Sequence, residues 1–153
     1  MRRARGFTLV EAMVALVVLA VGMLGIAGLY VTTLRSGGSA IYRMQAVNLA
    51  ADLADRIRTN RGAGLSYNGA AADNNCYGAA SVDCGPPQMA ANDLFVWQQQ
   101  ITGVPAQGVP PILPGGVGTV LVVGAAAPFT YTITINWAEA GGDTPSYTLT
   151  LQI

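Results

Sequence analysis

The chain has 153 residues, of which 52% are hydrophobic and only 10% charged, so we expect one globular domain together with a strongly apolar segment. Histidine and lysine are absent, which removes common general bases and metal ligands, and we therefore expect no enzymatic activity, no cofactor and no metal site. The net charge is zero, and without the three arginines of the first five residues it would be 5 − 8 = −3, so nucleic-acid binding is not expected in a chain that also has no lysine.

A short basic leader precedes a long apolar run at the N-terminus. Arg2, Arg3 and Arg5 come before residues 7–31, in which Glu11 is the only charged residue. A helix over these 25 residues would be about 37 Å long, enough to cross a bilayer core of about 30 Å. The positive-inside rule then predicts a single-pass inner-membrane protein with its N-terminus in the cytoplasm and the remaining chain in the periplasm.

Three other interpretations of this run are a cleaved secretory signal, a plain membrane anchor and a very apolar core helix. The run is longer than the apolar region of a secretory signal, and it has almost no polar residue before Thr32, unlike a core helix. A plain anchor stays open but leaves Glu11 unexplained, because an ionised carboxylate in an apolar membrane segment is costly. Cleavage between Gly6 and Phe7 would create an α-amino group one helical turn from Glu11. The partner of the Glu11 carboxylate could then be the amine of the same subunit or that of a neighbour.

The string Arg5-Gly6-Phe7-Thr8-Leu9-Val10-Glu11, followed at once by a long apolar helix, resembles the class III signal sequence of type IV pilins and of the pseudopilins of type II secretion. The resemblance implies that prepilin peptidase removes residues 1–6 and methylates the Phe7 amine. It also implies that Glu11 compensates an N-terminal amine during filament assembly. The implied partners are prepilin peptidase, the major pilin and other minor pilins, and inner-membrane lipid before the subunit enters a pilus on the cell surface.

Helical periodicity continues beyond the apolar run and predicts an amphipathic stalk half over residues 32–61. Its expected apolar positions are Ala46, Val47, Ala50, Leu53, Ala54 and Ile57. Its polar side offers two ion pairs, Asp52–Arg56 and Asp55–Arg58. The weak point is residues 36–39, Ser-Gly-Gly-Ser, where two glycines lower helix propensity and both a kink and an unbroken helix remain open.

Two cysteines, Cys76 and Cys84, lie eight positions apart in a segment rich in Gly, Asn, Asp and Pro. We predict a disulfide between them, because a short turn-rich loop brings them together. Two free thiols or half of a metal site are the alternatives, although the chain has no histidine and no third cysteine to complete a zinc site. A disulfide indicates an oxidising compartment such as the periplasm.

The globular head is expected over residues 62–153. A short helix over residues 92–101, capped by Asn92 or Asp93, is followed by three strands whose alternate residues are apolar. The predicted strands are residues 119–123, 129–137 and 147–153. They form an antiparallel meander whose apolar face covers the stalk helix, so we expect an α+β fold in which a long N-terminal transmembrane and stalk helix packs against a small sheet, as in pilins.

A narrower resemblance is to minor pilins of the PilV type. It rests on residues 16–29, on Leu113-Pro114-Gly115-Gly116 before a strand, and on the alternating segment from Tyr131 to Trp137; residues 62–72 fit no pattern. The resemblance implies a minor pilin of a type IV pilus that supports pilus assembly, adhesion or twitching motility. A type II secretion pseudopilin and a membrane-anchored periplasmic binding protein remain the alternatives.

Overall fold

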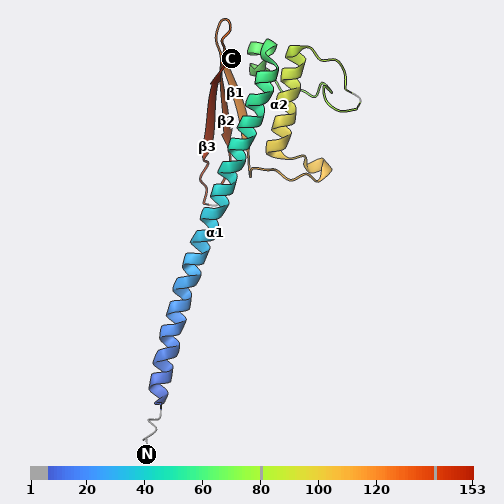
Figure 1. Cartoon of the computed structure of the whole chain (residues 1–153). Helices are drawn as coiled ribbons and strands as arrows, with labels where there is room; N and C mark the ends of the chain where they lie inside the picture. Colours follow the sequence, from blue (N-terminus) through green and yellow to red (C-terminus); the bar gives the residue numbers. More distant parts are fainter. Residues whose placement is uncertain (1–6, 80, 140) are drawn as a thin grey trace, which may run out of the picture. The chain divides into compact units, whose positions relative to one another are not determined.

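The computed structural model describes residues 7–79, 81–139 and 141–153, which form two compact units divided between Gly38 and Ser39. The helix α1 (Leu9–Thr59) contributes its first part to one unit and its second part to the other (Figure 1). Its α-helical assignment includes Gly37 and Gly38, so the helix is unbroken at the glycine pair. The division at residue 31 between a membrane half and a stalk half stays a prediction.

The first unit is an apolar helix whose side chains have no protein neighbours to cover them. All residues from 7 to 37 are exposed, and they include large apolar side chains such as Leu24, which is 73% exposed. The helix is long and apolar enough to cross a membrane, because it holds an 18-residue window with a mean hydropathy of 2.6 and no buried residue. Such a surface is stable only when lipid or other apolar helices cover it.

The second part of α1 supplies one side of the core of the second unit. Its buried residues are Ala46, Leu49, Ala50, Leu53, Ala54 and Ile57. The prediction was right for five of its six positions, but wrong for Val47, which is 40% exposed, while Leu49 was missed. Residues three or four positions apart lie on the same face of a helix, so Leu49 shares the buried face with Ala46. Val47 follows Ala46 directly and is rotated about 100° around the helix axis from Ala46. Both predicted ion pairs form on the polar side, at 3.0 Å for Asp52–Arg56 and 2.6 Å for Asp55–Arg58.

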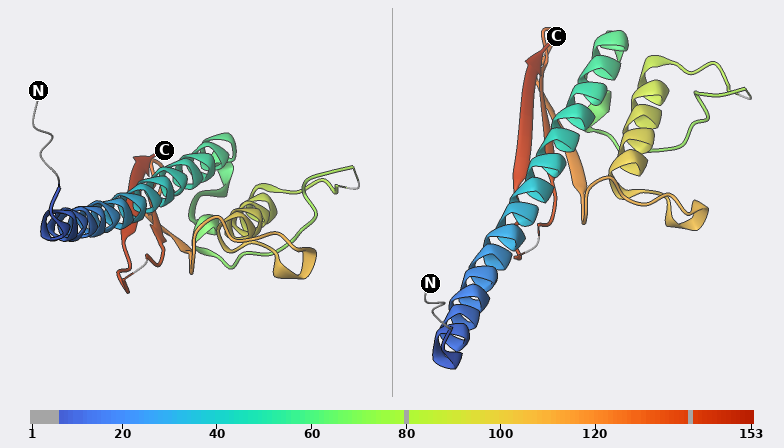
Figure 2. Two further views of the ribbon diagram at one scale, coloured as in Figure 1. Left: turned by 90° about the horizontal axis from the view of Figure 1, so that it is seen from below. Right: turned by 60° about the horizontal axis from the view of Figure 1, so that its bottom comes forward.

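Three antiparallel strands pair in sequence order, as predicted, and give the α+β fold expected. They are β1 (Val117–Val123), β2 (Thr130–Asn136) and β3 (Ser146–Gln152). In the register, Ile133 of β2 lies between Val120 of β1 and Leu149 of β3, and alternate residues point to the core. The second part of α1 lies over this inner face (Figures 1 and 2).

A second helix, α2 (Pro86–Thr102), packs beside α1, and two short 3₁₀ segments complete the unit, η1 (Arg61–Asn68) and η2 (Pro105–Gln107). The predicted start of α2 at Asn92 was wrong, because the helix begins at Pro86, and proline fits the first turn of a helix, where its missing N–H is not needed. The indole N–H of Trp97 donates to the Leu49 carbonyl oxygen of α1 at 2.9 Å. Gly118 of β1 leaves room for this indole, since a Cβ there would lie 2.4 Å from the Trp97 ring.

Candidate functional site

The predicted processing site lies at the start of α1. Gly6 falls outside the described residues, and Phe7 is 77% exposed and lies two residues before the start of the helix. Thr8 caps the helix, because its carbonyl oxygen accepts from the backbone N–H groups of Glu11 and Ala12 at 3.1 and 3.3 Å. The helix therefore begins within two residues of the predicted cleavage site.

Glu11 lies in the first turn of α1, where the partial positive charge of the helix N-terminus favours a carboxylate. Its backbone N–H also meets the Thr8 hydroxyl at 3.3 Å, which is one half of a capping box. Within the described residues its carboxylate has no hydrogen bond and no ion pair. Glu11 is thus free to pair with a cation supplied by the N-terminal amine or by another chain. The Thr8 cap was missed by sequence reasoning, although the Thr-x-x-Glu spacing signals it.

The predicted disulfide is confirmed: Cys76 and Cys84 are bonded, with their Cα atoms 5.8 Å apart. It closes part of the disulfide loop, which we define as residues 69–85 between η1 and α2. The buried side chain of Asn92 on α2 fastens this loop, since its amide oxygen accepts from the backbone N–H groups of Asn74 and Cys76 at 2.9 and 3.4 Å. The loop is therefore closed by its own covalent bridge and tied to the core by side-chain contacts.

A buried carboxylate gives the disulfide loop a second attachment. Asp93 is 1% exposed and accepts hydrogen bonds from the phenol groups of Tyr67, at 2.7 Å, and Tyr77. Arg56 of α1 balances its charge, with Nη1 3.5 Å from the carboxylate and the guanidinium 5.8 Å from the centre of the Tyr77 ring. Burial, reinforced by the Asp93 hydrogen bond, raises the pKa of Tyr77 to about 12 and also raises the pKa of Tyr67. Both phenols are therefore hydrogen-bond donors at neutral pH.

The Asp93 cluster, meaning Asp93, Tyr67, Tyr77 and Arg56, was not predicted as a unit. Asn92 and Asp93 were noticed only as helix caps, whereas they lie inside α2 and face the loop. Two adjacent polar residues in an otherwise apolar stretch of helix were the only local signal. In the described part of the chain no three His, Cys, Asp or Glu side chains gather as metal ligands. The cluster holds the disulfide loop against α2, because Tyr77 of the loop donates to Asp93 of the helix.

The described residues combine an exposed apolar helical segment with a small antiparallel sheet that the second part of α1 helps to cover. Two family models match the chain: the prokaryotic N-terminal methylation motif over residues 1–27 and type IV pilin Tt1218 over residues 28–95. Together they support a type IV pilin with a class III signal sequence, and neither match singles out the PilV type. Both end before β1. Searches of curated proteins and of solved structures gave no significant match.

Proposed function

We propose that this chain is a minor pilin of a type IV pilus. The precursor lies in the inner membrane with its N-terminus in the cytoplasm and residues 62–153 in the periplasm. Prepilin peptidase cleaves between Gly6 and Phe7 and methylates the Phe7 amine, and the mature subunit then enters the filament through its N-terminal helix. The single observation that supports this most strongly is a fully exposed apolar helix whose first turn carries one unpaired carboxylate, Glu11.

The exposed apolar surface explains why the subunit needs two successive environments. Lipid covers residues 7–31 before assembly, and the apolar helices of neighbouring subunits cover the same residues in the filament. A carboxylate can stay in such a helix when an opposite charge neutralises it. The new amine at Phe7 of a neighbouring subunit supplies that charge. Glu11 therefore exchanges an unpaired carboxylate in lipid for an ion pair in the filament.

The assignment to a minor subunit depends on the resemblance of residues 16–29, 113–116 and 131–137 to PilV-type proteins. Edman sequencing of the mature protein from sheared, purified pili tests the processing step, and N-methylated phenylalanine is the expected first residue. Mass-spectrometric counting against the major pilin tests the abundance, and a ratio well below one is expected. A ratio near one makes the chain a major pilin. Its absence from pili, with loss of type II secretion on deletion, makes it a pseudopilin, and an intact Met1 makes it a plain anchor.

A further inference from the structure

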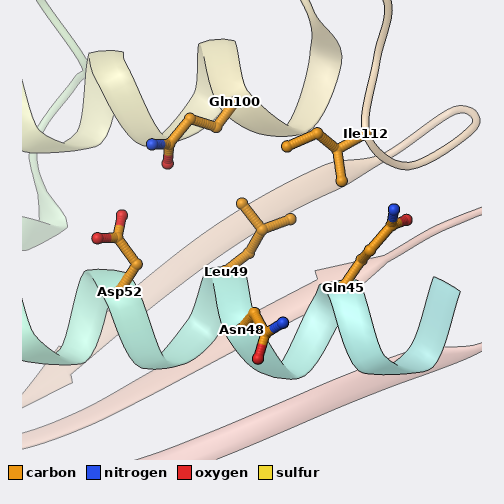
Figure 3. A pocket seen from close by; sticks show the side chains of 6 residues that line it. All are labelled: Gln45, Asn48, Leu49, Asp52, Gln100 and Ile112. Atoms are coloured by element: carbon orange, nitrogen blue, oxygen red, sulfur yellow. The ribbon is translucent and has the colours of Figure 1, made fainter. Parts of the chain in front are cut away.

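A groove of about 300 Å³ lies between α1 and α2 in the second unit. Figure 3 shows Gln45 and Asp52 on either side of Leu49 along α1, facing Gln100 of α2 and Ile112 of the following segment across the groove. Leu49 is buried and Ile112 is 39% exposed, so the two aliphatic side chains form an apolar part that opens to solvent. We call this the α1–α2 groove.

Three hydrogen-bond acceptors of the α1–α2 groove have no partner among the described residues. The side-chain oxygens Oε1 of Gln45 and of Gln100 are buried and make no hydrogen bond. The Oδ2 atom of Asp52 accepts a hydrogen bond from Nε of Arg56 at 3.0 Å, and the other carboxylate oxygen of Asp52 makes no hydrogen bond or ion pair among the described residues. Buried acceptors without a partner are rare, because each loses its hydration without compensation. Two such buried acceptors in one groove, beside the partly exposed carboxylate of Asp52, favour a ligand that brings several donors.

The charge of the surrounding residues selects the sign of that ligand. Asp52 and Asp93 share a single guanidinium, that of Arg56, so this part of the second unit keeps one negative charge in excess. Residues 39–153 as a whole carry seven acidic and four basic side chains, a net charge of 4 − 7 = −3. A concave site within a negative surface attracts cations. The groove therefore fits a positively charged donor.

We propose that the α1–α2 groove binds an arginine side chain of a protein partner. A guanidinium presents five N–H donors in a plane and fits acceptors that face one another across the groove, Asp52 on α1 and Gln100 on α2 (Figure 3). Its aliphatic stem lies on Leu49 and Ile112, as long charged side chains do on apolar surfaces. A lysine ammonium is compact and more strongly hydrated, so it fits separated acceptors less well. This goes beyond the proposed function and does not depend on it, because it concerns the second unit alone.

The test uses the full chain in detergent micelles and two small probes of matched shape. Acetyl-arginine amide carries the guanidinium, and acetyl-citrulline amide replaces it with a neutral urea. Titration followed by ¹⁵N–¹H NMR should give a dissociation constant on the order of millimolar for the arginine probe, with shifts at Leu49 and at the Gln100 side-chain amide. The citrulline probe should bind about tenfold more weakly, because charge-assisted hydrogen bonds are lost.

Matched variants separate the groove from the general charge of the surface. Asp52→Asn and Gln100→Met should each weaken the arginine probe about tenfold, while Asp55→Asn and Gln98→Met should leave it unchanged. Asp55 is paired with Arg58 and Gln98 is exposed, so neither control touches the three free acceptors.

Thermal unfolding gives a readout independent of binding. Gln100→Met should keep or raise the melting temperature, because it removes a buried acceptor without a partner, and this outcome shows that the lost binding is not lost folding. Three results would overturn the proposal: no shifts at the groove, equal binding of the citrulline probe, or equal weakening by Asp55→Asn and Asp52→Asn.

Discussion

Glu11 has two roles that the structure allows, and replacing it in two ways distinguishes them. As the third residue after the Thr8 cap it supports the start of α1, and as an unpaired carboxylate it is available to a neighbouring Phe7 amine. Glu11→Ala removes the whole carboxylate side chain but keeps the backbone N–H that donates to the Thr8 hydroxyl. Glu11→Gln keeps the polar side chain that a capping box accepts and removes only the charge. Thr8→Val removes the capping hydroxyl and keeps the charge.

The expected sizes of the two effects differ. The hydrogen bond from the Glu11 N–H to the Thr8 hydroxyl is 3.3 Å long, beyond the usual range, so the cap is a weak one and its loss should lower incorporation about twofold. An unpaired charge inside the nearly water-free core of a filament should lower it by about a hundredfold or more. Glu11→Gln and Glu11→Ala should therefore behave alike, and Thr8→Val should remain close to the wild type.

Competition within one cell measures these factors directly. A tagged wild-type chain and an untagged variant are expressed together, and their ratio in sheared pili is divided by their ratio in the inner membrane. The mature mass of each variant serves as a control, since all should still be cleaved after Gly6. We expect both Glu11 variants to accumulate in the membrane and to be nearly absent from pili. If Glu11→Gln enters pili as well as the wild type, the carboxylate is not a charge partner and the proposed assembly role of Glu11 is wrong.

Four further predictions concern processing and the second unit. Gly6→Val should leave the precursor uncut, because a β-branched side chain blocks the approach of the peptidase, and a mature mass by mass spectrometry would contradict this. Replacing Cys76 and Cys84 by serine should lower the free energy of unfolding by about 2.5 kcal/mol, measured in urea with tryptophan fluorescence; an unchanged midpoint would mean that the side-chain contacts alone hold the loop. Asp93→Asn should cost about 2 to 4 kcal/mol in the same assay, because it removes the buried charge that accepts from two phenols and leaves the partly buried guanidinium of Arg56 with one ion pair fewer; a cost below about 0.5 kcal/mol would show that the cluster is not structural. The contribution of Tyr77 to the free energy of unfolding should be fully present below pH 10 and should fall as the pH rises toward about 12. Folding raises the pKa of Tyr77, so the folded state holds the phenol proton more tightly than the unfolded state does. Tyr77→Phe should make this alkaline decline shallower, and an identical slope would exclude Tyr77 as a contributor.

The features that could be predicted from the sequence are those written in local patterns. The N-terminal motif from Arg5 to Glu11 lies within a few residues, and β2 follows from the alternation between Phe129 and Trp137. The Asp52–Arg56 pair follows from a spacing of four on a helix. Each of these depends on the conformation of one segment, so no knowledge of the fold was needed to find them.

The features that could not be predicted join segments that are far apart in the chain. Tyr67 and Asp93 are 26 residues apart, and their hydrogen bond exists only because η1 and α2 pack together. Gln45 and Gln100 line one groove although they belong to different helices. Gly118 is a further example, because a glycine within a strand pattern does not indicate which side chain packs against it. In the structure this side chain is the Trp97 indole of α2. Tertiary packing assigns these residues their roles, and periodicity carries no information about which elements pack.

The boundary between Gly38 and Ser39 places the predicted assembly residues and the proposed binding features in different compact units. Glu11 and Phe7 lie in the first unit, whereas the disulfide loop and the α1–α2 groove lie in the second and are held by contacts made within that unit alone. Sites without shared contacts contribute independently to stability and binding. Changes in the loop or groove can therefore alter what the second unit contacts without altering how the helix enters a filament. A subunit used in small numbers to carry a distinct surface on a common filament needs this independence.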